Sequence, residues 1–283
     1  MKITKKHDRV EVSDFGGINL RLSLFCGQAF RWTEKSDGLF SGVVGNVPLS
    51  VRQEGDALIF YGPTVRQVGE AVVPYFDLDT DYGALLAPLR SDAFVGSAIE
   101  KYGILRIFNQ PHFEALVSFI VSQCNNIPRI RSIVGRMCSL FGEPLGDGNF
   151  SFPAPGSLAS AAPEELGALR SGYRESYIRS AASAVASGRT DLVSLESLGT
   201  AELRKELAEL EGVGRKVADC VMLFSYERRE VFPVDRHIKN VCAEIYPGGV
   251  PDEIGNSGLA QQYLFLARAS DAGSLKNLAE KPG

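Results

Sequence analysis

The stretch LEGVGRKVADC, from Leu210 to Cys220, places a lysine two residues after the second of two glycines and at the start of an apolar helical pattern. The spacing predicts a helix, a Gly-Val-Gly turn and a second helix, with Gly212 and Gly214 in the turn and Lys216 in the next helix. Glycines let a backbone approach a partner closely, and the free amides at a helix N-terminus can hold an anion such as a phosphate. The alternative is an ordinary turn between helices with a glycine cap.

Asp235, nineteen residues after Lys216, is the second candidate for chemistry. It stands in FPVDRH, residues 232–237, just before a helical stripe of apolar residues. An aspartate in that place is a good N-cap, which is its structural interpretation. The two roles do not exclude each other. The joint occurrence of the glycine turn, the lysine and the aspartate favours a functional site.

The pattern of secondary structure along the chain predicts an α+β fold. Residues from about 9 to 62 alternate apolar and polar positions between turn signals, which is typical of an antiparallel β meander. Helical patterns begin near residue 63 and continue to about 269, whereas the glycine- and proline-rich segment 146–157 is expected to be a loop. We predict a β-rich N-terminal domain with flanking helices, residues 1–105, and an all-α domain, residues 106–283, with the hairpin at about 201–226.

Composition narrows the function classes. The 283 residues carry a net charge of −4 and a pI near 5.6, so any nucleic-acid contact must come from a local face and not from bulk charge. The five cysteines are far apart and lack the spacing of a zinc or iron–sulfur site, which predicts free thiols in a reducing cytoplasm. No apolar stretch is long enough to cross a bilayer, and the first residues lack the apolar segment of a signal peptide.

Six blocks of the sequence together resemble one family. GVGRKVADC and PVDRH resemble the helix-hairpin-helix DNA glycosylases that carry a glycine/proline-rich loop and a catalytic aspartate, the HhH-GPD superfamily. GQAFRW (27–32), SFIVSQCNNIPRI (118–130), GYRESY (172–177) and AQQYLF (260–265) follow in the order and spacing of its 8-oxoguanine DNA glycosylase branch. The resemblance covers nearly the whole chain.

This resemblance implies a bifunctional repair enzyme with two catalytic residues. Lys216 would attack C1′ of the deoxyribose, expel the damaged base and form a Schiff base, after which β-elimination cuts the strand 3′ to the lesion. The attack needs an uncharged amine, whereas free lysine is protonated near pH 7, so its surroundings must lower the pKa. Asp235 would stabilise positive charge on the sugar, orient the lysine or shuttle its proton, and the sequence leaves these three roles open.

The resemblance also implies a pocket for an extruded base. The carbonyl of Gly27 would accept the N7–H that distinguishes 8-oxoguanine from guanine, while Gln261 would bond the Watson–Crick edge. Cys220 and Phe265 would sandwich the ring. Without the family, both of these last residues would be read as core residues.

Contacts to the DNA itself are implied for a further set of residues. Tyr173 would intercalate at the vacated step, Arg129 and Arg174 would read the estranged cytosine, and His237 would contact a phosphate. The complete implied set is Asn125, Arg129, Tyr173, Arg174, Gly212, Gly214 and His237.

Three positions depart from the family pattern. Cys124 stands where family members often carry an asparagine beside the orphan cytosine, which puts strictness for cytosine in doubt because a thiol is a weak donor. Pro128 occupies a position that is usually small. Arg268 stands where an acid can support the phosphate-binding histidine, so the orientation of His237 is left open.

The expected partner is double-stranded DNA containing 8-oxoguanine, bound by a monomer in a prokaryotic cytoplasm or, for a eukaryotic source, in the nucleus. No membrane partner, metal, iron–sulfur cluster or other required cofactor is expected, although the hairpin carbonyls could hold a structural cation. Two alternatives stay open. The same fold could act on another damaged base, or the hairpin could be a DNA-binding module without catalysis, which would show salt-sensitive binding and no turnover.

Overall fold

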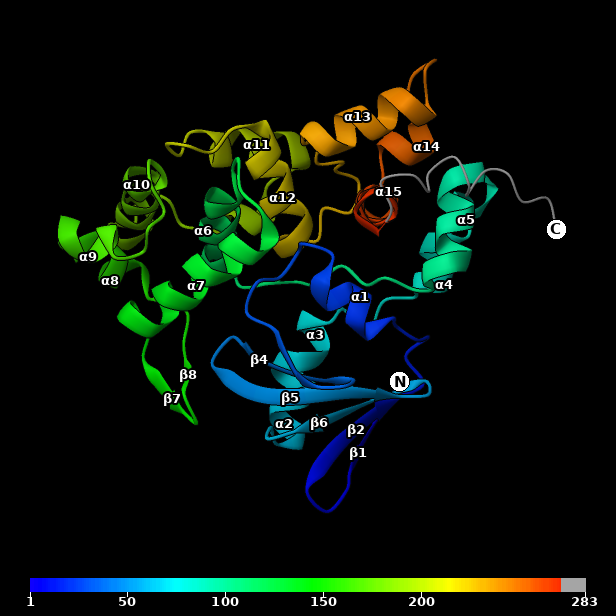
Figure 1. Ribbon diagram of the computed structural model, residues 1–283, viewed down its shortest axis with the longest axis horizontal. Coiled ribbons are helices and arrows are strands. Elements are labelled where there is room, and N and C mark those ends of the chain that lie inside the picture. The colour runs from blue at the N-terminus through cyan, green and yellow to red at the C-terminus, as the bar shows by residue number, and fades with distance from the viewer. Residues whose placement is uncertain (271–283) are drawn as a thin grey trace.

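The computed structural model describes residues 1–270, so the last thirteen residues of the predicted second domain lie outside the described range. Figure 1 shows a β-sheet on one side of a larger helical region. Within the described residues, six strands form one antiparallel sheet in the order β1-β2-β6-β5-β4-β3. The strands are β1 (Lys2–Lys5), β2 (Arg9–Ser13), β3 (Thr33–Ser36), β4 (Leu39–Val44), β5 (Val47–Glu54) and β6 (Ala57–Tyr61).

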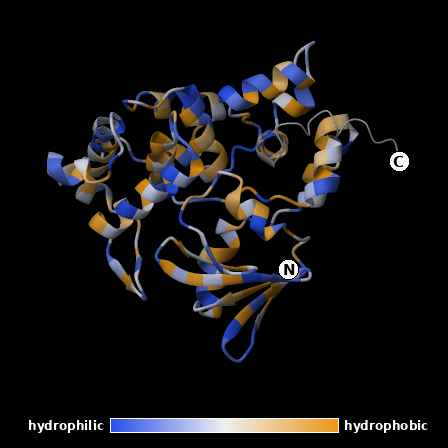
Figure 2. Ribbon diagram, in the orientation of Figure 1, coloured by the Kyte–Doolittle hydropathy of each residue, from blue (hydrophilic) through white to orange (hydrophobic). Residues whose placement is uncertain are grey.

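The register of the sheet follows from its tight turns. Val44 pairs with Val47 across Gly45-Asn46, and Glu54 pairs with Ala57 across Gly55-Asp56. Both turn glycines have positive φ, 56° and 59°, as two-residue hairpin turns require. The pleat then sends alternate side chains into the core, and hydrophilic and hydrophobic residues alternate along the strands in Figure 2. The antiparallel sheet is confirmed, and β3 to β6 form the predicted meander. The prediction was wrong for the first part of the segment, because α1 interrupts it and β2 pairs with β6 instead of β3.

The helices of residues 1–270 are short or of medium length. Those before the hairpin are α1 (Leu20–Phe25), α2 (Val65–Gln67), η1 (Val68–Val72), α3 (Val73–Tyr75), α4 (Tyr82–Leu86), η2 (Pro88–Ser91), α5 (Ala93–Tyr102), α6 (His112–Ser122), α7 (Ile127–Phe141), α8 (Pro155–Ser160), α9 (Pro163–Gly167), α10 (Arg174–Ala186) and η3 (Ser194–Ser197). The hairpin consists of α11 (Thr200–Ala208) and α12 (Arg215–Ser225), followed by α13 (Arg236–Ile245), α14 (Asp252–Gly255) and α15 (Gly258–Ser270). None of the helices in residues 1–270 is both long and apolar enough to span a membrane.

The prediction that 146–157 is a loop was wrong. The segment takes part in a small hairpin, β7 (Pro144–Gly146) with β8 (Asn149–Phe150), and then in α8. Asp147 and Gly148 both have positive φ, 50° and 72°, which is the turn geometry of a two-residue hairpin. Pro155 stands at the first position of α8, where its fixed φ suits a helix start. The glycine and proline were therefore signals of element boundaries.

Hydrophobic packing divides the chain differently from the predicted boundary at residue 105. One core joins the sheet to α1 and to the segment from Val68 to Leu78, and it includes Phe108 from beyond that boundary. The other core holds α4 and α5 together with the later helices. The two helices therefore belong with the helical region, because their apolar faces pack on it and not on the sheet.

Buried polar contacts fix the segment after α1 at the junction of the two cores. The Gln28 side chain donates to the carbonyls of Ser23 and Arg106, both at 2.8 Å, and accepts from the amide of Phe108 at 2.8 Å. Gln110 donates to the Gln28 carbonyl at 2.8 Å. Because every one of these groups is buried, leaving one unpaired would be costly, so the backbone next to Gly27 is rigidly placed.

Candidate active site

A cavity of about 300 Å³ lies where segments far apart in the sequence converge. Its walls come from the segment after α1, the α6–α7 connection, α12, the start of α13 and α15. Its lining residues are Cys26, Gly27, Phe30, Phe119, Ser122, Asn125, Asn126, Ile127, Ile130, Lys216, Cys220, Phe224, Pro233, Asp235, His237, Gln261, Gln262 and Phe265. The cavity thus brings together the predicted catalytic pair and all four predicted base-pocket residues.

Lys216 is half-buried in the first turn of α12 and lines this cavity. Its Nζ donates to Oγ of Ser122 at 3.3 Å and lies 5.6 Å from the centre of the Phe119 ring. Phe119 is itself stacked on Phe224, with ring centres 5.3 Å apart. The ammonium group therefore points away from bulk solvent and against an aromatic wall, in a site partly stripped of water.

Asp235 lines the same cavity and caps α13. Its carboxylate accepts from the amide of Ile238 at 2.8 Å, which confirms the predicted N-cap. The cap fixes the side chain at the mouth of the cavity and leaves the second carboxylate oxygen available. Asp235 therefore combines a structural hydrogen bond with a position on the cavity wall.

The hairpin that carries Lys216 is closed by a charge pair and by a close packing contact. Nε of Arg204 on α11 donates to the Asp219 carboxylate on α12 at 2.6 Å, and Asp219 is buried. Gly212 has a φ of 79°, and a Cβ there would meet the Tyr177 ring at 2.3 Å. Gly214 is the N-cap of α12, has no side-chain cap and faces open space. The amides of the first turn of α12 are therefore accessible to an anion.

We expect the two hairpin glycines to respond differently to alanine. Gly212→Ala combines a disfavoured backbone conformation with an overlap on Tyr177 and should lower the free energy of unfolding by about 1–3 kcal/mol. Gly214→Ala meets no atom within 4 Å and should cost less than about 1 kcal/mol, while its methyl group weakens the approach of DNA. Thermal unfolding and DNA titration measure the two effects, and equal destabilisation would contradict this division of roles.

The four base-pocket candidates line one cavity. Gly27 has a φ of 88°, and a Cβ there would lie 3.3 Å from Ile127 and 3.4 Å from Phe265. Burial raises the pKa of the Cys220 thiol, although the nearby Lys216 ammonium opposes the shift. The thiol is therefore uncharged at neutral pH and presents an apolar face to the cavity.

Gln261 does not stand alone in the cavity. Gln262, also 5% exposed, donates from Nε2 to Oε1 of Gln261 at 2.7 Å. Oε1 of Gln262 is buried and has no hydrogen-bond partner among the described residues. An unsatisfied buried acceptor of this kind costs about 1–3 kcal/mol of stability.

Several predicted DNA contacts lie at the surface. Tyr173 is 56% exposed and packs edge-to-face on Tyr177, with ring centres 5.9 Å apart. Arg129 and His237 are exposed, and His237 also borders the cavity. Asn125 lines the cavity and donates to the carbonyl of Val121 at 3.1 Å. These side chains are available to a partner molecule.

Arg174, predicted to read a cytosine, is placed differently. It is 5% exposed, and its guanidinium donates to the carbonyls of Gln123, Cys124 and Ser171. Cys124 is exposed and has a φ of 45°, so the loop between α6 and α7 holds a backbone conformation that a non-glycine residue rarely adopts. In this structure Arg174 therefore braces that loop, because burial requires its donors to find carbonyl partners.

The local structure accommodates two other residues that depart from the family pattern, Pro128 and Arg268. Pro128 stands in the first turn of α7, where a proline is tolerated because its missing N–H would have no helical partner. Nη1 of Arg268 lies 3.7 Å from the Glu244 carboxylate. Arg268 thus forms an ion pair with α13 at its C-terminal end.

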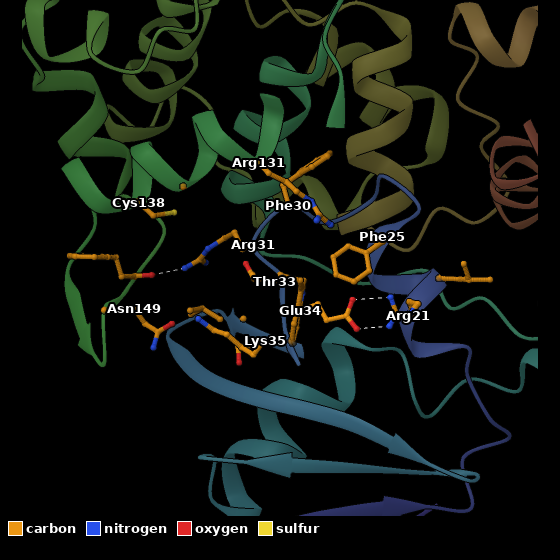
Figure 3. Close-up of a pocket in the computed structure, with 18 of the residues that line it drawn as sticks. Arg21, Phe25, Phe30, Arg31, Thr33, Glu34, Lys35, Arg131, Cys138 and Asn149 are labelled. Atoms are coloured by element: carbon orange, nitrogen blue, oxygen red, sulfur yellow. Dashed lines mark hydrogen bonds and ion pairs between the residues drawn. The ribbon is translucent and has the colours of Figure 1, made fainter. Parts of the chain in front are cut away.

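A larger cavity of about 790 Å³ lies between the sheet, α7 and the β7–β8 hairpin, and it contains neither Lys216 nor Asp235. In Figure 3, the Arg31 side chain extends toward the β7–β8 hairpin, whereas Arg131 comes from α7. Arg31 is paired with buried Glu114 at 2.8 Å, and the Arg131 guanidinium lies 4.3 Å from the centre of the Phe25 ring. The predicted catalytic pair, Lys216 and Asp235, lines the smaller cavity. Across residues 1–270, no group of three or more His, Cys, Asp or Glu side chains is arranged to hold a metal ion.

Sequence reasoning missed three residues around the predicted lysine and glutamine: Ser122, Phe119 and Gln262. Ser122 and Phe119 lie in the block SFIVSQCNNIPRI, but no local pattern links them to Lys216. Ser122 and Lys216, for example, are 94 residues apart in the sequence. Gln262 left a usable signal, since it directly follows Gln261 in AQQYLF and a polar residue is unexpected in an otherwise buried helix.

Comparisons with known proteins agree with this geometry. Residues 11–116 match the family described as 8-oxoguanine DNA glycosylase, N-terminal domain, and residues 117–252 match the HhH-GPD superfamily base excision DNA repair protein family. The N-glycosylase/DNA lyase OGG1 of Arabidopsis thaliana is 30% identical over 239 residues, which are 80% of this chain and 65% of that relative. The chain thus spans just under two thirds of the length of this curated relative.

Two solved structures match almost from end to end. MBOgg1, in complex with a low-affinity DNA ligand, is 37% identical with a TM-score of 0.88, covering 93% of this chain and 96% of that one. The Clostridium acetobutylicum 8-oxoguanine glycosylase/lyase, in complex with double-stranded DNA containing cytosine opposite 8-oxoguanine, is 29% identical with a TM-score of 0.88, covering 95% and 98%. The chain, with its hairpin lysine and capping aspartate on one cavity, belongs to the 8-oxoguanine DNA glycosylase family of the HhH-GPD superfamily.

Proposed function

We propose that the protein is an N-glycosylase and DNA lyase that removes 8-oxoguanine from double-stranded DNA and cuts the strand at the resulting abasic site. The observation that carries this proposal is the position of Lys216. Its amine lies against an aromatic wall in a cavity of about 300 Å³, which is the lower end of the range for small-molecule sites. A non-catalytic DNA-binding module would need neither the enclosed lysine nor the aspartate beside the cavity.

The reaction begins with extrusion of the damaged nucleotide, because Lys216 cannot reach a base that is stacked in a duplex. The exposed Tyr173 is suited to fill the vacated step, and the open amides at Gly214 are suited to a backbone phosphate. These contacts need no bulk positive charge, which reconciles DNA binding with a net charge of −4.

The neutral amine of Lys216 then attacks C1′ of the extruded nucleotide. The bond from C1′ to the base breaks, and the bonding electrons leave with the base, which takes up a proton. Asp235 stabilises the positive charge that develops on the sugar. Loss of the amine protons and opening of the sugar give a Schiff base between Nζ and C1′.

Strand cleavage follows from the acidity of the Schiff base. The imine acidifies the C2′ proton, and its removal drives elimination of the 3′ phosphate oxygen, which breaks the strand 3′ to the lesion. The Ser122 hydroxyl, 3.3 Å from Nζ, is placed to hold the amine in line before the attack. Water later hydrolyses the imine and frees the lysine.

Borohydride trapping tests the proposal directly. The reductant converts the Schiff base into a stable amine, so the wild-type protein should form a covalent adduct with 8-oxoguanine DNA. The experiment should place each of the four bases opposite the lesion, because Cys124 stands where an asparagine is common. We propose that cytosine is preferred. Equal trapping opposite all four bases would overturn that preference, and base release without trapping would overturn the amine mechanism.

Gly27→Ala tests whether the pocket reads 8-oxoguanine. A methyl group at a φ of 88°, 3.3 Å from Ile127 and 3.4 Å from Phe265, should move the carbonyl that we assign to the N7–H. We expect the ratio of 8-oxoguanine excision to abasic-site cleavage to fall by about tenfold or more, as for a lost specific hydrogen bond. Gly17→Ala is the matched control, since Gly17 has a φ of 86° but lies outside the cavity.

An unchanged ratio in Gly27→Ala would remove the assignment of that carbonyl. A panel of other lesions, including alkylated bases, should be run in parallel. Faster excision of one of these than of 8-oxoguanine would favour the alternative in which the same fold acts on another damaged base.

A further inference from the structure

The larger cavity, of about 790 Å³, has the size of a small-molecule site and a charge opposite to that of the whole protein. Its lining includes one carboxylate, Glu34, and four cationic side chains: Arg21, Arg31, Lys35 and Arg131. The chain as a whole has a net charge of −4. Positive charge is therefore gathered in this cavity in spite of the overall composition.

Two of the four cations already have partners. Nη1 of Arg21 donates to the Glu34 carboxylate at 2.8 Å, and Figure 3 shows this pair in the cavity wall. Nη1 of Arg31 donates to the Glu114 carboxylate at 2.8 Å, and its Nη2 donates to the carbonyl of Phe150 at 2.6 Å. The cations left to attract a ligand are therefore Arg131 and Lys35.

The Arg131 guanidinium makes no hydrogen bond or ion pair within residues 1–270, and its Nε and Nη2 are buried without a partner. It lies 4.3 Å from the centre of the Phe25 ring, which covers one of its faces. Nη1 also has no partner but is not buried, so it is the nitrogen that a ligand can reach. Burial lowers the pKa of Arg131, and no nearby carboxylate raises it again. The side chain still carries its charge, because an arginine does not lose its proton in a protein.

A guanidinium with free donors against an aromatic wall is suited to an oxyanion, whose oxygens accept from its planar fork. Lys35 is exposed, lines the same cavity and lies nearer the sheet than Arg131 does in Figure 3. Two cations without carboxylate partners favour a ligand that can carry two negative charges. We propose that the larger cavity binds the phosphate group of a small molecule and that Arg131 is its anchor.

This site is separate from the proposed chemistry, since neither Lys216 nor Asp235 lines the larger cavity. Failure of the glycosylase proposal would therefore leave it standing, and its own failure would leave the glycosylase proposal standing.

Equilibrium dialysis with inorganic phosphate at constant ionic strength tests the anchor. The wild type should bind one equivalent, and Arg131→Met should bind it about tenfold or more weakly, as for a lost hydrogen bond to a charged group. Methionine keeps an apolar side chain against Phe25 and removes two buried donors without partners, so this variant should stay folded.

Two other substitutions are controls for charge and for place. Arg189→Met removes the same charge from an exposed position outside the cavity and should bind phosphate as the wild type does. Lys216→Gln removes the lysine of the smaller cavity and should also leave phosphate binding unchanged.

Gly135→Leu is a second test that leaves Arg131 in place. Gly135 lines the cavity on α7, and a Cβ there meets no atom within 4 Å, so a leucine can occupy the space of the ligand. Leucine also favours a helix over glycine, so the fold should not be weakened. We expect phosphate binding to fall by about tenfold or more. Gly156→Leu on α8, equally open and outside the cavity, is the matched control.

Thymidine 5′-monophosphate and thymidine distinguish the sources of the phosphate group. Tighter binding of the nucleotide than of inorganic phosphate would assign the cavity to nucleotides, and equal binding would assign it to the free ion. Either result supports the site, provided that thymidine itself does not bind.

Four outcomes would overturn the inference. These are absence of saturable phosphate binding in the wild type, unchanged binding in both Arg131→Met and Gly135→Leu, loss of binding in Lys216→Gln, and binding of thymidine as tight as that of its monophosphate. The third would place the anion in the smaller cavity, and the fourth would show that the phosphate group is not what the protein recognises.

Discussion

Replacing Lys216 with glutamine is expected to abolish both the borohydride-trapped adduct and strand cleavage. Glutamine is close in length and can still donate to Ser122, so the hairpin and the cavity wall should keep their shape. An amide cannot act as the amine nucleophile, and no Schiff base can form. We expect the single-turnover rate to fall by a factor on the order of 10³ or more, the scale seen when a nucleophile is removed.

Lys239→Gln is the matched control for this substitution. Lys239 is exposed on α13, outside the smaller cavity, and its loss removes the same charge. It should trap at the wild-type rate and show at most a slightly altered salt dependence of DNA binding. If Lys216→Gln still trapped on 8-oxoguanine or abasic DNA, another amine would be the nucleophile and the mechanism would have to be reassigned.

Asp235→Asn should separate the two roles of the aspartate. Asparagine caps a helix as well as aspartate does, so the hydrogen bond to the amide of Ile238 should survive and the free energy of unfolding should change little. The negative charge is lost, however. Removal of a group aimed at developing charge typically costs about 10²–10³ in rate. We expect a loss of about 100-fold in base excision under single-turnover conditions.

Loss of folded protein cannot explain a 100-fold loss of activity in these variants. A 100-fold loss corresponds to about 2.7 kcal/mol in the activation barrier. Asp235→Ala, which also removes the cap, should cost only about 1 kcal/mol of a total stability of about 5–15 kcal/mol, so it stays folded. If Asp235→Asn retained full activity while Asp235→Ala lost it, the aspartate would be a helix cap only.

The hairpin and its neighbours were predictable because their signals are local. Gly212 and Gly214 mark the turn, Asp235 precedes an apolar helical stripe, and Gly45-Asn46 closes a tight strand turn. Each of these depends on backbone conformations set by a few adjacent residues. The structure confirms the α+β class, the meander of β3 to β6 and the hairpin at these places. The same local reading failed at Asp147-Gly148, where a turn signal belonged to a hairpin that looked like part of a loop.

Burial could not be predicted in the same way. Arg174 was expected to read a cytosine, and the structure shows it 5% exposed and donating to the carbonyl of Gln123, 51 residues away in sequence. Whether an arginine meets water or a carbonyl depends on which distant segments pack around it, and periodicity within one helix carries no information on that point. The placement of α4 and α5 with the helical core has the same origin.

Patterns in the sequence were enough to predict the class of fold, the hairpin, the candidate lysine and aspartate, and the family to which the chain belongs. The contacts of the amine with the Ser122 hydroxyl and the Phe119 ring, and the hydrogen bond between the Gln262 and Gln261 amides, became visible only in the folded structure. The physical reason is that local pattern fixes backbone conformation, whereas solvation and hydrogen-bond direction arise from contacts between segments that the chain brings together only when it folds.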